Sequence, residues 1–265
     1  MAVGHRLSLH PAARRSNGAG CRGAVLTHHI TVVAKTGSTN ADLLTAATLA
    51  RPWPEGHWLI ADRQISGRGR LGRNWQDGAG NFMGSVTVAL RGSDPPAHSL
   101  ALVAGLALHN ALAMLGGPAR MTLKWPNDLL VDGAKLAGIL AERVGDHVVI
   151  GIGINLVQAP EVAGRRTVSL AQLGCPIDRD QVAQTLARCF ADALLDWRSG
   201  AWPTTILARW HAAAHPRDTA LTLSEGEYAG LTGRFDGLEQ DGSLALRLSD
   251  GRRLVIHAGD VTPAD

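Results

Sequence analysis

The sequence predicts an α+β protein in which a mixed β-sheet is flanked by helices and a small β-barrel follows at the C-terminal end. Between residues 30 and 216, strand-like runs rich in β-branched residues are separated by helix-like apolar periods. After residue 216, short alternating strands follow one another with glycine turns, which is typical of a small barrel. A length of 265 residues is enough for one large domain plus this appendage.

Six strands are expected in the large domain. They are residues 29–35 (HITVVAK), 58–62, 81–90 (NFMGSVTVAL), 121–124, 135–142 and 147–155. A turn around Asp132 and Gly133 separates the strands at 121–124 and 135–142.

Three helices are expected in the same domain, two between these strands and one after them. Residues 41–50 begin after TGSTN, where Thr39 and Asp42 have the spacing of a capping box. Residues 99–115 and 181–197 each carry apolar side chains at helical spacing, so both are expected in the core. The helix at 99–115 is too short for a membrane span and contains His109 and Asn110, so no membrane association is expected.

Charge and cysteine content narrow the functional class. Residues 1–41 carry no Asp or Glu, and without their basic residues the chain is slightly acidic, so we expect no DNA partner. Residues 1–29 are predicted to be a disordered basic tail, with a transit peptide as the weaker alternative. Cys21, Cys175 and Cys189 lie far apart, which suits neither zinc nor disulfides and favours the cytoplasm.

The first motif is GRGRLGRNW at residues 67–75. Arg68, Arg70 and Arg73 bring fork-shaped donors suited to carboxylate and phosphate oxygens, while the three glycines let the backbone approach a ligand closely. Its GxGxxG pattern also suggests a dinucleotide turn, but the polar RNWQDGAGN that follows is no helix. Taken alone, the motif is also compatible with a solvated linker.

The second motif is KWPND at residues 124–128, followed by KLAGILAE at 135–142. Lys124 could neutralise a phosphate, Asn127 could bind phosphate or ribose, and Asp128 could hold Mg²⁺. Taken alone, Pro-Asn-Asp is a simple turn, and a lone strand lysine such as Lys135 is usually solvated.

The third motif is VVIGIGIN at residues 148–155. Because strand side chains alternate between faces, the isoleucines fill one face while Gly151 and Gly153 leave the other bare. A bare face can be the floor of a pocket, and Asn155 stands at its end. The alternative is a strand crossed closely by another backbone.

Together, GSTN at 37–40, Gln64 before the arginine loop, KWPND with KLAGILAE, and GIGIN at 151–155 resemble biotin protein ligases in order and spacing. The resemblance implies that residues 30–216 form a biotin- and ATP-binding catalytic domain similar to the class II aminoacyl-tRNA synthetase core, with an SH3-like domain at 217–265. Ser66 stands where the family usually has alanine. No helix-turn-helix precedes the core, so the resemblance is to the monofunctional class without a DNA-binding domain.

The resemblance also implies an activity. Such ligases form biotinyl-5'-AMP from biotin and ATP with Mg²⁺, and then transfer biotin to a lysine of a biotin carboxyl carrier protein. The expected enzyme is cytoplasmic and is a monomer or a weak homodimer.

Site residues follow from the same resemblance. The catalytic residues would be Lys135, Arg68 and Arg70, the metal ligand would be Asp128, and Trp75 would stack on adenine. The biotin-binding set would be Ser38, Thr39, Asn40, Gln64, Gly67, Arg68, Gly69, Arg70, Lys135, Gly138, Gly151 and Gly153. The ATP-binding set would be Arg70, Arg73, Trp75, Lys124, Asn127 and Asn155.

Two rival functions were weighed against this one. A lipoate or octanoate ligase would need a long apolar tunnel, and the arginine loop argues against it. A non-catalytic biotin sensor is opposed by the lack of DNA-binding sequence and by the presence of Lys135, Arg68 and Asp128.

Overall fold

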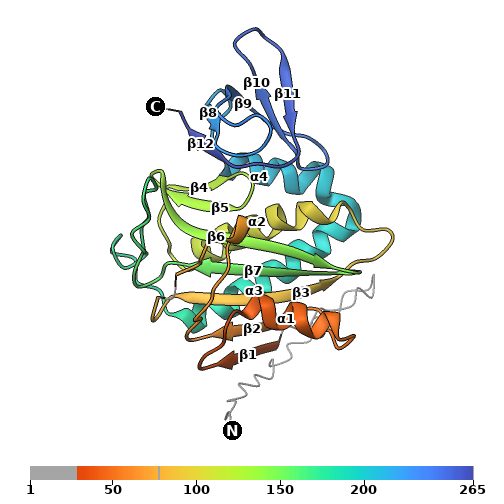
Figure 1. The fold of residues 1–265 in the computed structure, drawn as a ribbon, viewed down its shortest axis with the longest axis vertical. Helices are drawn as coiled ribbons and strands as arrows, with labels where there is room; N and C mark the ends of the chain where they lie inside the picture. The colour runs from red at the N-terminus through yellow and green to blue at the C-terminus, as the bar shows by residue number, and fades with distance from the viewer. Residues whose placement is uncertain (1–28, 77, 265) are drawn as a thin grey trace, which may run out of the picture.

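The computed structural model describes residues 29–76 and 78–264, and it confirms the predicted fold class. A seven-stranded mixed sheet with helices on both faces forms the larger part, and a five-stranded antiparallel sheet forms the C-terminal part (Figure 1). The predicted tail at residues 1–29 lies outside the described residues, apart from His29, which begins the first strand.

The large sheet has the strand order β1-β2-β3-β7-β6-β5-β4. The strands are β1 (His29–Val33), β2 (His57–Ala61), β3 (Phe82–Ala89), β4 (Met121–Lys124), β5 (Asp128–Val131), β6 (Ala134–Val144) and β7 (His147–Ile154). Only β1 and β2 pair in parallel among these strands, and helix α1 (Thr39–Thr48) forms the crossover that such a pair requires. The central pairs β3–β7 and β6–β7 carry the long registers that hold the site.

Strand β5 was missed in the sequence prediction. KWPND therefore forms the β4–β5 hairpin, with Asp128 as the first residue of a strand, and the Asp132–Gly133 turn joins β5 to β6. Both turn residues have positive φ, as a two-residue hairpin turn favours. DLLV is buried throughout and so lacks the alternation that marks a half-exposed strand.

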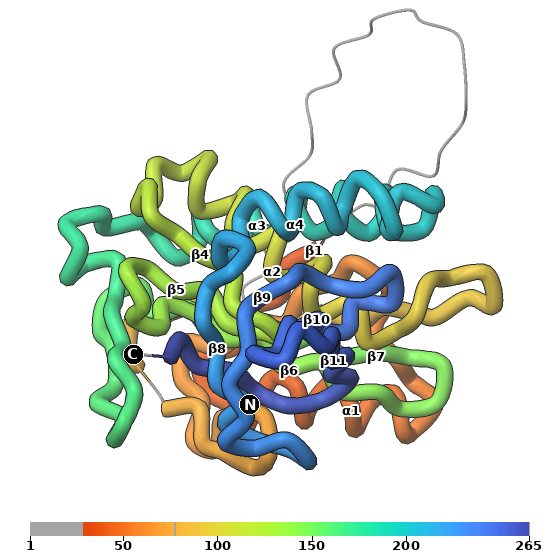
Figure 2. The backbone as a smooth tube through the Cα atoms, turned by 90° about the horizontal axis from the view of Figure 1, so that it is seen from above, coloured from red at the N-terminus to blue at the C-terminus, as the bar shows by residue number. Residues whose placement is uncertain are grey.

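Helices cover the two faces of the large sheet unequally. Helices α2 (Leu100–Met114) and α3 (Arg179–Asp196) lie on one face and α1 on the other (Figure 2). The isoleucines of β7 belong to the core on the α2 side, as the alternation predicted. The length argument against a membrane span was wrong, because the segment Ala97–Met114 is long and apolar enough to cross a membrane, but 61% of it is buried inside the protein. This confirms α2 as a core helix.

Helix α1 is capped differently from the prediction. Its N-cap is Ser38, whose hydroxyl accepts from the Ala41 backbone amide. The helix thus begins one residue earlier than a Thr39–Asp42 capping box would require, and Asp42 instead accepts from the Thr36 hydroxyl at 2.5 Å. Thr39 is left to point its side chain toward the sheet.

The C-terminal part is reached through a helical segment that the sequence did not predict. A helical segment (Trp197–Ile206) that is kinked at Gly200, where φ is 88°, runs into α4 (Leu207–Ala213). The predicted domain boundary at residue 216 falls between α4 and β8. The second sheet has the order β11-β10-β9-β8-β12. Its strands are β8 (Ala220–Leu223), β9 (Thr232–Leu238), β10 (Leu244–Arg247), β11 (Arg253–Ile256) and β12 (Val261–Pro263).

The β9–β10 loop fastens the second sheet to the core. Trp125, which follows Lys124 in the second motif, donates its indole N–H to the Gly242 carbonyl at 3.1 Å, and Trp202 donates to the Gln240 carbonyl at 2.8 Å. The C-terminal sheet is therefore held against the turn of the β4–β5 hairpin and against the segment Trp197–Ile206.

Candidate active site

A cavity of about 500 Å³ lies where the start of α1, the arginine loop, β6, β7 and the C-terminal sheet meet. It is lined by all of the predicted site residues except Gly67 and Lys124. The three motifs, which are far apart in sequence, thus converge on one hollow.

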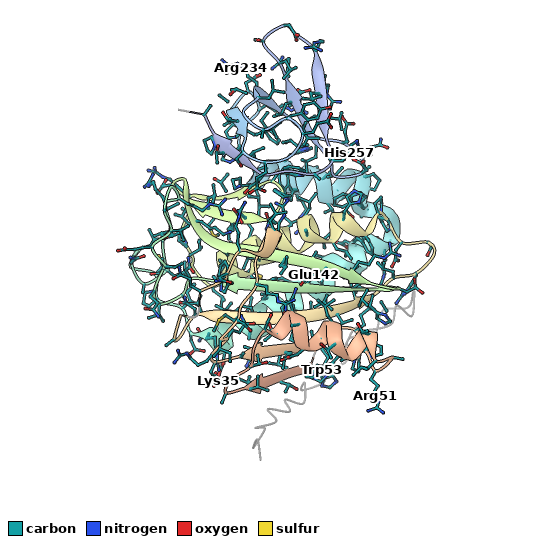
Figure 3. The ribbon with its side chains drawn as sticks, in the orientation of Figure 1. Lys35, Arg51, Trp53, Glu142, Arg234 and His257 are labelled. Atoms are coloured by element: carbon teal, nitrogen blue, oxygen red, sulfur yellow. The ribbon has the colours of Figure 1, made fainter. Side chains whose placement is uncertain are left out.

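A chain of buried hydrogen bonds forms one end of the cavity. Gln64 Oε1 accepts from the Thr39 backbone amide at 2.7 Å and from its hydroxyl at 3.1 Å, which fixes the orientation of the Gln64 amide. Ser85 Oγ lies 2.7 Å from Thr39 Oγ1 and donates to Asn40 Oδ1 at 2.7 Å. Asn40 donates onward to Glu142 Oε2 at 2.8 Å, on the sheet face beside α1 (Figure 3). Such a network presents polar groups in fixed directions.

The glycines of β6 and β7 make room for protein side chains. A Cβ at Gly153 would overlap the Trp75 indole, and a Cβ at Gly138 would come within 3.1 Å of the same ring. A Cβ at Gly151 would overlap the Asn40 amide. The bare strand face expected from the sequence therefore exists, but Trp75 and Asn40 lie directly on it.

The arginine loop folds as a small hairpin. The Trp75 amide donates to the Gly67 carbonyl at 2.9 Å, and the Gly69 amide donates to the Arg73 carbonyl at 2.7 Å. Leu71, at φ 55°, and Gly72, at φ 73°, form the tip. A Cβ at Gly67 would lie 2.6 Å from the Trp75 carbonyl oxygen, so this glycine permits the hairpin to close.

Two loop arginines contact the C-terminal sheet. Arg70 donates to the Gly259 carbonyl at 2.8 Å and to Asn127 Oδ1 at 3.3 Å. Arg73 pairs with Glu225, and its guanidinium lies 3.7 Å from Asp260. Burial lowers the pKa of Arg70, with Asp260 acting in the opposite direction.

Lys135 lies beside the buried Asp128 carboxylate, with 2.6 Å between Nζ and Oδ1. Burial lowers the pKa of Lys135, and Asp128 partly offsets this by stabilising the charged form. The Lys135 ammonium also lies 5.7 Å from the centroid of the Trp75 ring. The amine thus combines a charge partner, an aromatic face and access to the cavity.

Lys124 takes a different position from the one expected of a phosphate ligand. Its side chain is 4% exposed, and its ammonium donates to Asp260 Oδ1 at 2.5 Å and to the Val261 carbonyl at 2.8 Å. It also lies 3.5 Å from Asp128 Oδ2. Lys124 therefore joins β4 to β12 beneath the cavity wall.

Comparison with known proteins identifies this arrangement. The family described as the biotin/lipoate A/B protein ligase family matches residues 32–155. The biotin–[acetyl-CoA-carboxylase] ligase of Mycobacterium tuberculosis is 40% identical over 242 residues, which cover 87% of each chain. The chain belongs to the biotin protein ligase family. The ligase of the same name from Paracoccus denitrificans is 38% identical and covers 87% of this chain and 98% of that relative.

The fold agrees with a solved member of the biotin protein ligase family. The structure of the Aquifex aeolicus biotin protein ligase in complex with biotin and ATP matches with a TM-score of 0.76 at 26% identity. The match covers 88% of this chain and 97% of the other. It therefore includes both the large sheet and the C-terminal sheet.

Among the cavity residues that the sequence analysis missed, three polar or charged ones matter most for the chemistry: Ser85, Arg165 and Asp260. Ser85 is a polar residue within the apolar β3, and that contrast was its only signal in the sequence. Asp260 directly precedes β12 of the C-terminal sheet and lies far from every motif in the sequence. Burial alone would raise the Asp260 pKa, but Lys124, Arg165 and Arg70 hold it below its usual range.

Asn155 fastens the segment that carries Arg165. Its side-chain amide donates to the Lys135 carbonyl at 3.3 Å and to the Val168 carbonyl at 3.2 Å. Asn155, which the sequence predicts to contact the nucleotide, thus holds the segment that follows β7 in position.

The carboxylates of the cavity do not fit a resident metal ion. Within residues 29–76 and 78–264, no cluster of three or more His, Cys, Asp or Glu side chains could hold one. Asp128, the predicted metal ligand, lies within 3.6 Å of three cations, which are Lys124, Lys135 and Arg165. The charge of the Asp128 carboxylate is therefore already balanced by side chains, which leaves no unpaired negative charge there for Mg²⁺.

Proposed function

We propose that this chain is an ATP-dependent ligase that forms biotinyl-5'-AMP and transfers biotin to a lysine of a biotin carboxyl carrier protein. The observation that carries the proposal is the convergence of an oriented polar end, an aromatic wall and a cluster of cations in one cavity. The family relationship over most of the chain supports the same reaction.

The first step joins two anions. A carboxylate oxygen of biotin attacks the α-phosphorus of ATP, a P–O bond forms, and pyrophosphate leaves with its electron pair. Charge repulsion opposes this approach, so fixed cations placed before the reaction lower the barrier. Lys135 is proposed to contact the carboxylate and the α-phosphate, while Arg68 and Arg70 close the loop over the adenylate.

The second step is acyl transfer. The neutral amine of the acceptor lysine attacks the biotinyl carbonyl carbon, an amide bond forms, and AMP leaves as the amine loses a proton. The arginine loop must then open to admit the acceptor lysine. This opening would break the hydrogen bonds from Arg70 to Asn127 Oδ1 and to the Gly259 carbonyl.

Ligand assignments follow the lining of the cavity. The polar end at Ser38, Thr39, Asn40 and Gln64 is proposed to bind the ureido ring of biotin, and Trp75 to stack on adenine. Gly138, Gly151 and Gly153 act by seating Trp75 and Asn40. Arg73, Asn127 and Asn155 remain proposed nucleotide contacts. Lys124 is reassigned to joining the two sheets.

Metal and partners complete the proposal. Mg²⁺ is proposed to enter as part of the Mg·ATP substrate, because triphosphate oxygens supply most of its ligands in such sites. The partner is a carboxyl carrier domain, the location is the cytoplasm, and the state is a monomer or a weak homodimer without a DNA or membrane partner.

The direct test is acyl transfer to a carrier domain. Purified enzyme, ATP and an apo carrier are incubated with biotin, lipoate or octanoate, and the carrier is analysed by intact mass. We expect a mass increase with biotin alone, at one lysine. Modification by lipoate or octanoate without modification by biotin would favour the rival ligase.

A further inference from the structure

Arg165 is the one arginine on the segment after β7 that lines the cavity, among the residues that the structure describes. Its side chain is 27% exposed, so it is neither a surface arginine nor a fully buried one. Arg165 Nη1 lies 3.6 Å from Asp128 Oδ2, and Nη2 lies 3.1 Å from Asp260 Oδ2. The guanidinium therefore spans the carboxylate at the start of β5 in the large sheet and the carboxylate that directly precedes β12 of the C-terminal sheet.

The backbone fixes which way Arg165 points. The Lys135 amide donates to the Arg166 carbonyl at 2.8 Å, and the Val168 amide donates to the Lys135 carbonyl at 3.0 Å, so the segment runs extended beside β6. Neighbouring side chains of an extended segment point in opposite directions. Arg165 accordingly faces the cavity, while Arg166 is exposed and donates to the Asp132 carbonyl at 3.4 Å.

Arg165 and Lys135 contact the same carboxylate, that of Asp128. Asp128 contacts Lys135 through Oδ1 and Arg165 through Oδ2, so the two cations flank a single side chain. If Lys135 contacts the α-phosphate, Arg165 beside it is positioned to contact the β- and γ-phosphates, which leave as pyrophosphate. A planar guanidinium with two donors suits that group better than a solvated surface charge would.

We infer that Arg165 binds the β- and γ-phosphates of ATP, and that Asp128 and Asp260 hold it in place before ATP arrives. This role rests on the proposed ligase function and deepens it. The present partners of the guanidinium lie 3.1 and 3.6 Å away, and a polyphosphate carries more negative charge than either carboxylate and can accept from both arms of the guanidinium. Arg165 would then stabilise negative charge as it builds up on the departing pyrophosphate.

The test compares Arg165→Ala with Arg166→Ala, which removes the same charge one residue away. In biotin-dependent ATP–pyrophosphate exchange, Arg165→Ala should raise the KM for ATP by about tenfold or more, as expected for a lost charge-assisted hydrogen bond. Arg166→Ala should stay within about twofold of wild type. The Kd for biotin, measured by calorimetry, should be the same in all three proteins.

A second measurement separates phosphate contact from a merely structural role. Arg165→Ala should weaken binding of a non-hydrolysable ATP analogue more than binding of AMP, because only the former carries β- and γ-phosphates. Arg165→Lys should restore part of the loss, since it keeps the charge without the fork. Equal weakening of both nucleotides, or an unchanged KM for ATP, would overturn the assignment. Loss of exchange in the wild-type enzyme would overturn the ligase function instead.

Discussion

At the scale of the residue, the charge state and the orientation of site side chains are set by burial and by the groups that contact them. Lys135 has its pKa lowered by burial, while Asp128 keeps an anion within 2.6 Å of the amine. Gln64 has its amide orientation set by two donors from Thr39. The chemistry expected of each residue thus depends on neighbours that lie far away in the sequence.

Lys135→Ala should lower biotin-dependent adenylation by a factor of roughly 10² or more, because a preorganised cation is lost where negative charge develops. Pyrophosphate exchange measures this directly. Lys35→Ala is the matched control, since Lys35 is an exposed lysine that does not line the cavity (Figure 3). Near wild-type exchange in Lys135→Ala would remove Lys135 from the mechanism.

At the scale of elements, the pairing of β6 with β7 creates the seat of Trp75. Gly138 and Gly153 face each other across the two strands, and the Trp75 ring lies over both. The arginine loop therefore depends on two glycines more than sixty residues away. The contact of the Trp75 ring with both glycines holds the arginine loop against the sheet.

Gly153→Ala should displace the Trp75 ring and raise the KM for ATP by at least about tenfold, since the added methyl overlaps the indole. Gly92→Ala is the control, because a Cβ there would meet nothing within 4 Å. In a double-mutant cycle, Gly153→Ala should cost less in the Trp75→Ala background than in wild type. Strict additivity would mean that the two residues do not interact.

The β4–β12 connection should contribute strongly to stability. Lys124→Met removes the cation that lies nearest to Asp260. Breaking a buried ion pair of this kind should lower the free energy of unfolding by about 3 kcal/mol. Urea denaturation gives this value. Arg120→Met breaks the exposed pair with Asp132 and should cost no more than about 1 kcal/mol. Equal costs would show that Lys124 does not join the sheets as described.

The site residues within the sequence motifs could be predicted from the sequence, whereas the cavity residues outside the motifs could not. GIGIN placed its isoleucines in the core because alternation in a strand is a local property. By contrast, β5 lacks alternation, and Arg165 and Asp260 have no local signal at all. Asp260 enters the cavity only because Lys124 and Trp125 hold the C-terminal sheet in place, and this docking depends on tertiary packing.

At the scale of the whole molecule, ion pairs and a charge-assisted hydrogen bond join the catalytic part to the C-terminal part. Arg70, Arg73, Lys124 and Arg165 lie on the catalytic side, and their partners Glu225, Gly259 and Asp260 lie on the C-terminal side. The C-terminal sheet thus forms part of the cavity wall, and ligand binding and domain docking depend on the same cations.

Folding stability should fall on the acid side of neutrality. Burial lowers the pKa of His109, His211 and His215, so in the fold they stay neutral at a pH where the unfolded chain takes up protons. The unfolding free energy should therefore decrease as the pH drops below about 6.5. Asp260, whose pKa is lowered in the fold, adds a second loss below about pH 4.

Urea titrations at a series of pH values test this dependence. His215→Gln should make the decrease below about pH 6.5 shallower, because one proton fewer is taken up on unfolding. Replacement of the exposed His257 by Gln serves as the control (Figure 3). An identical slope in wild type and His215→Gln would exclude His215 from the effect.

The central claim is that this cavity joins biotin to the α-phosphate of ATP, and pyrophosphate exchange tests it most directly. Labelled pyrophosphate, ATP and Mg²⁺ are incubated with the enzyme, with and without biotin. The account predicts that label enters ATP only when biotin is present, because only the reverse of biotinyl-adenylate formation can incorporate it. No exchange with biotin, or the same exchange without it, would contradict the account.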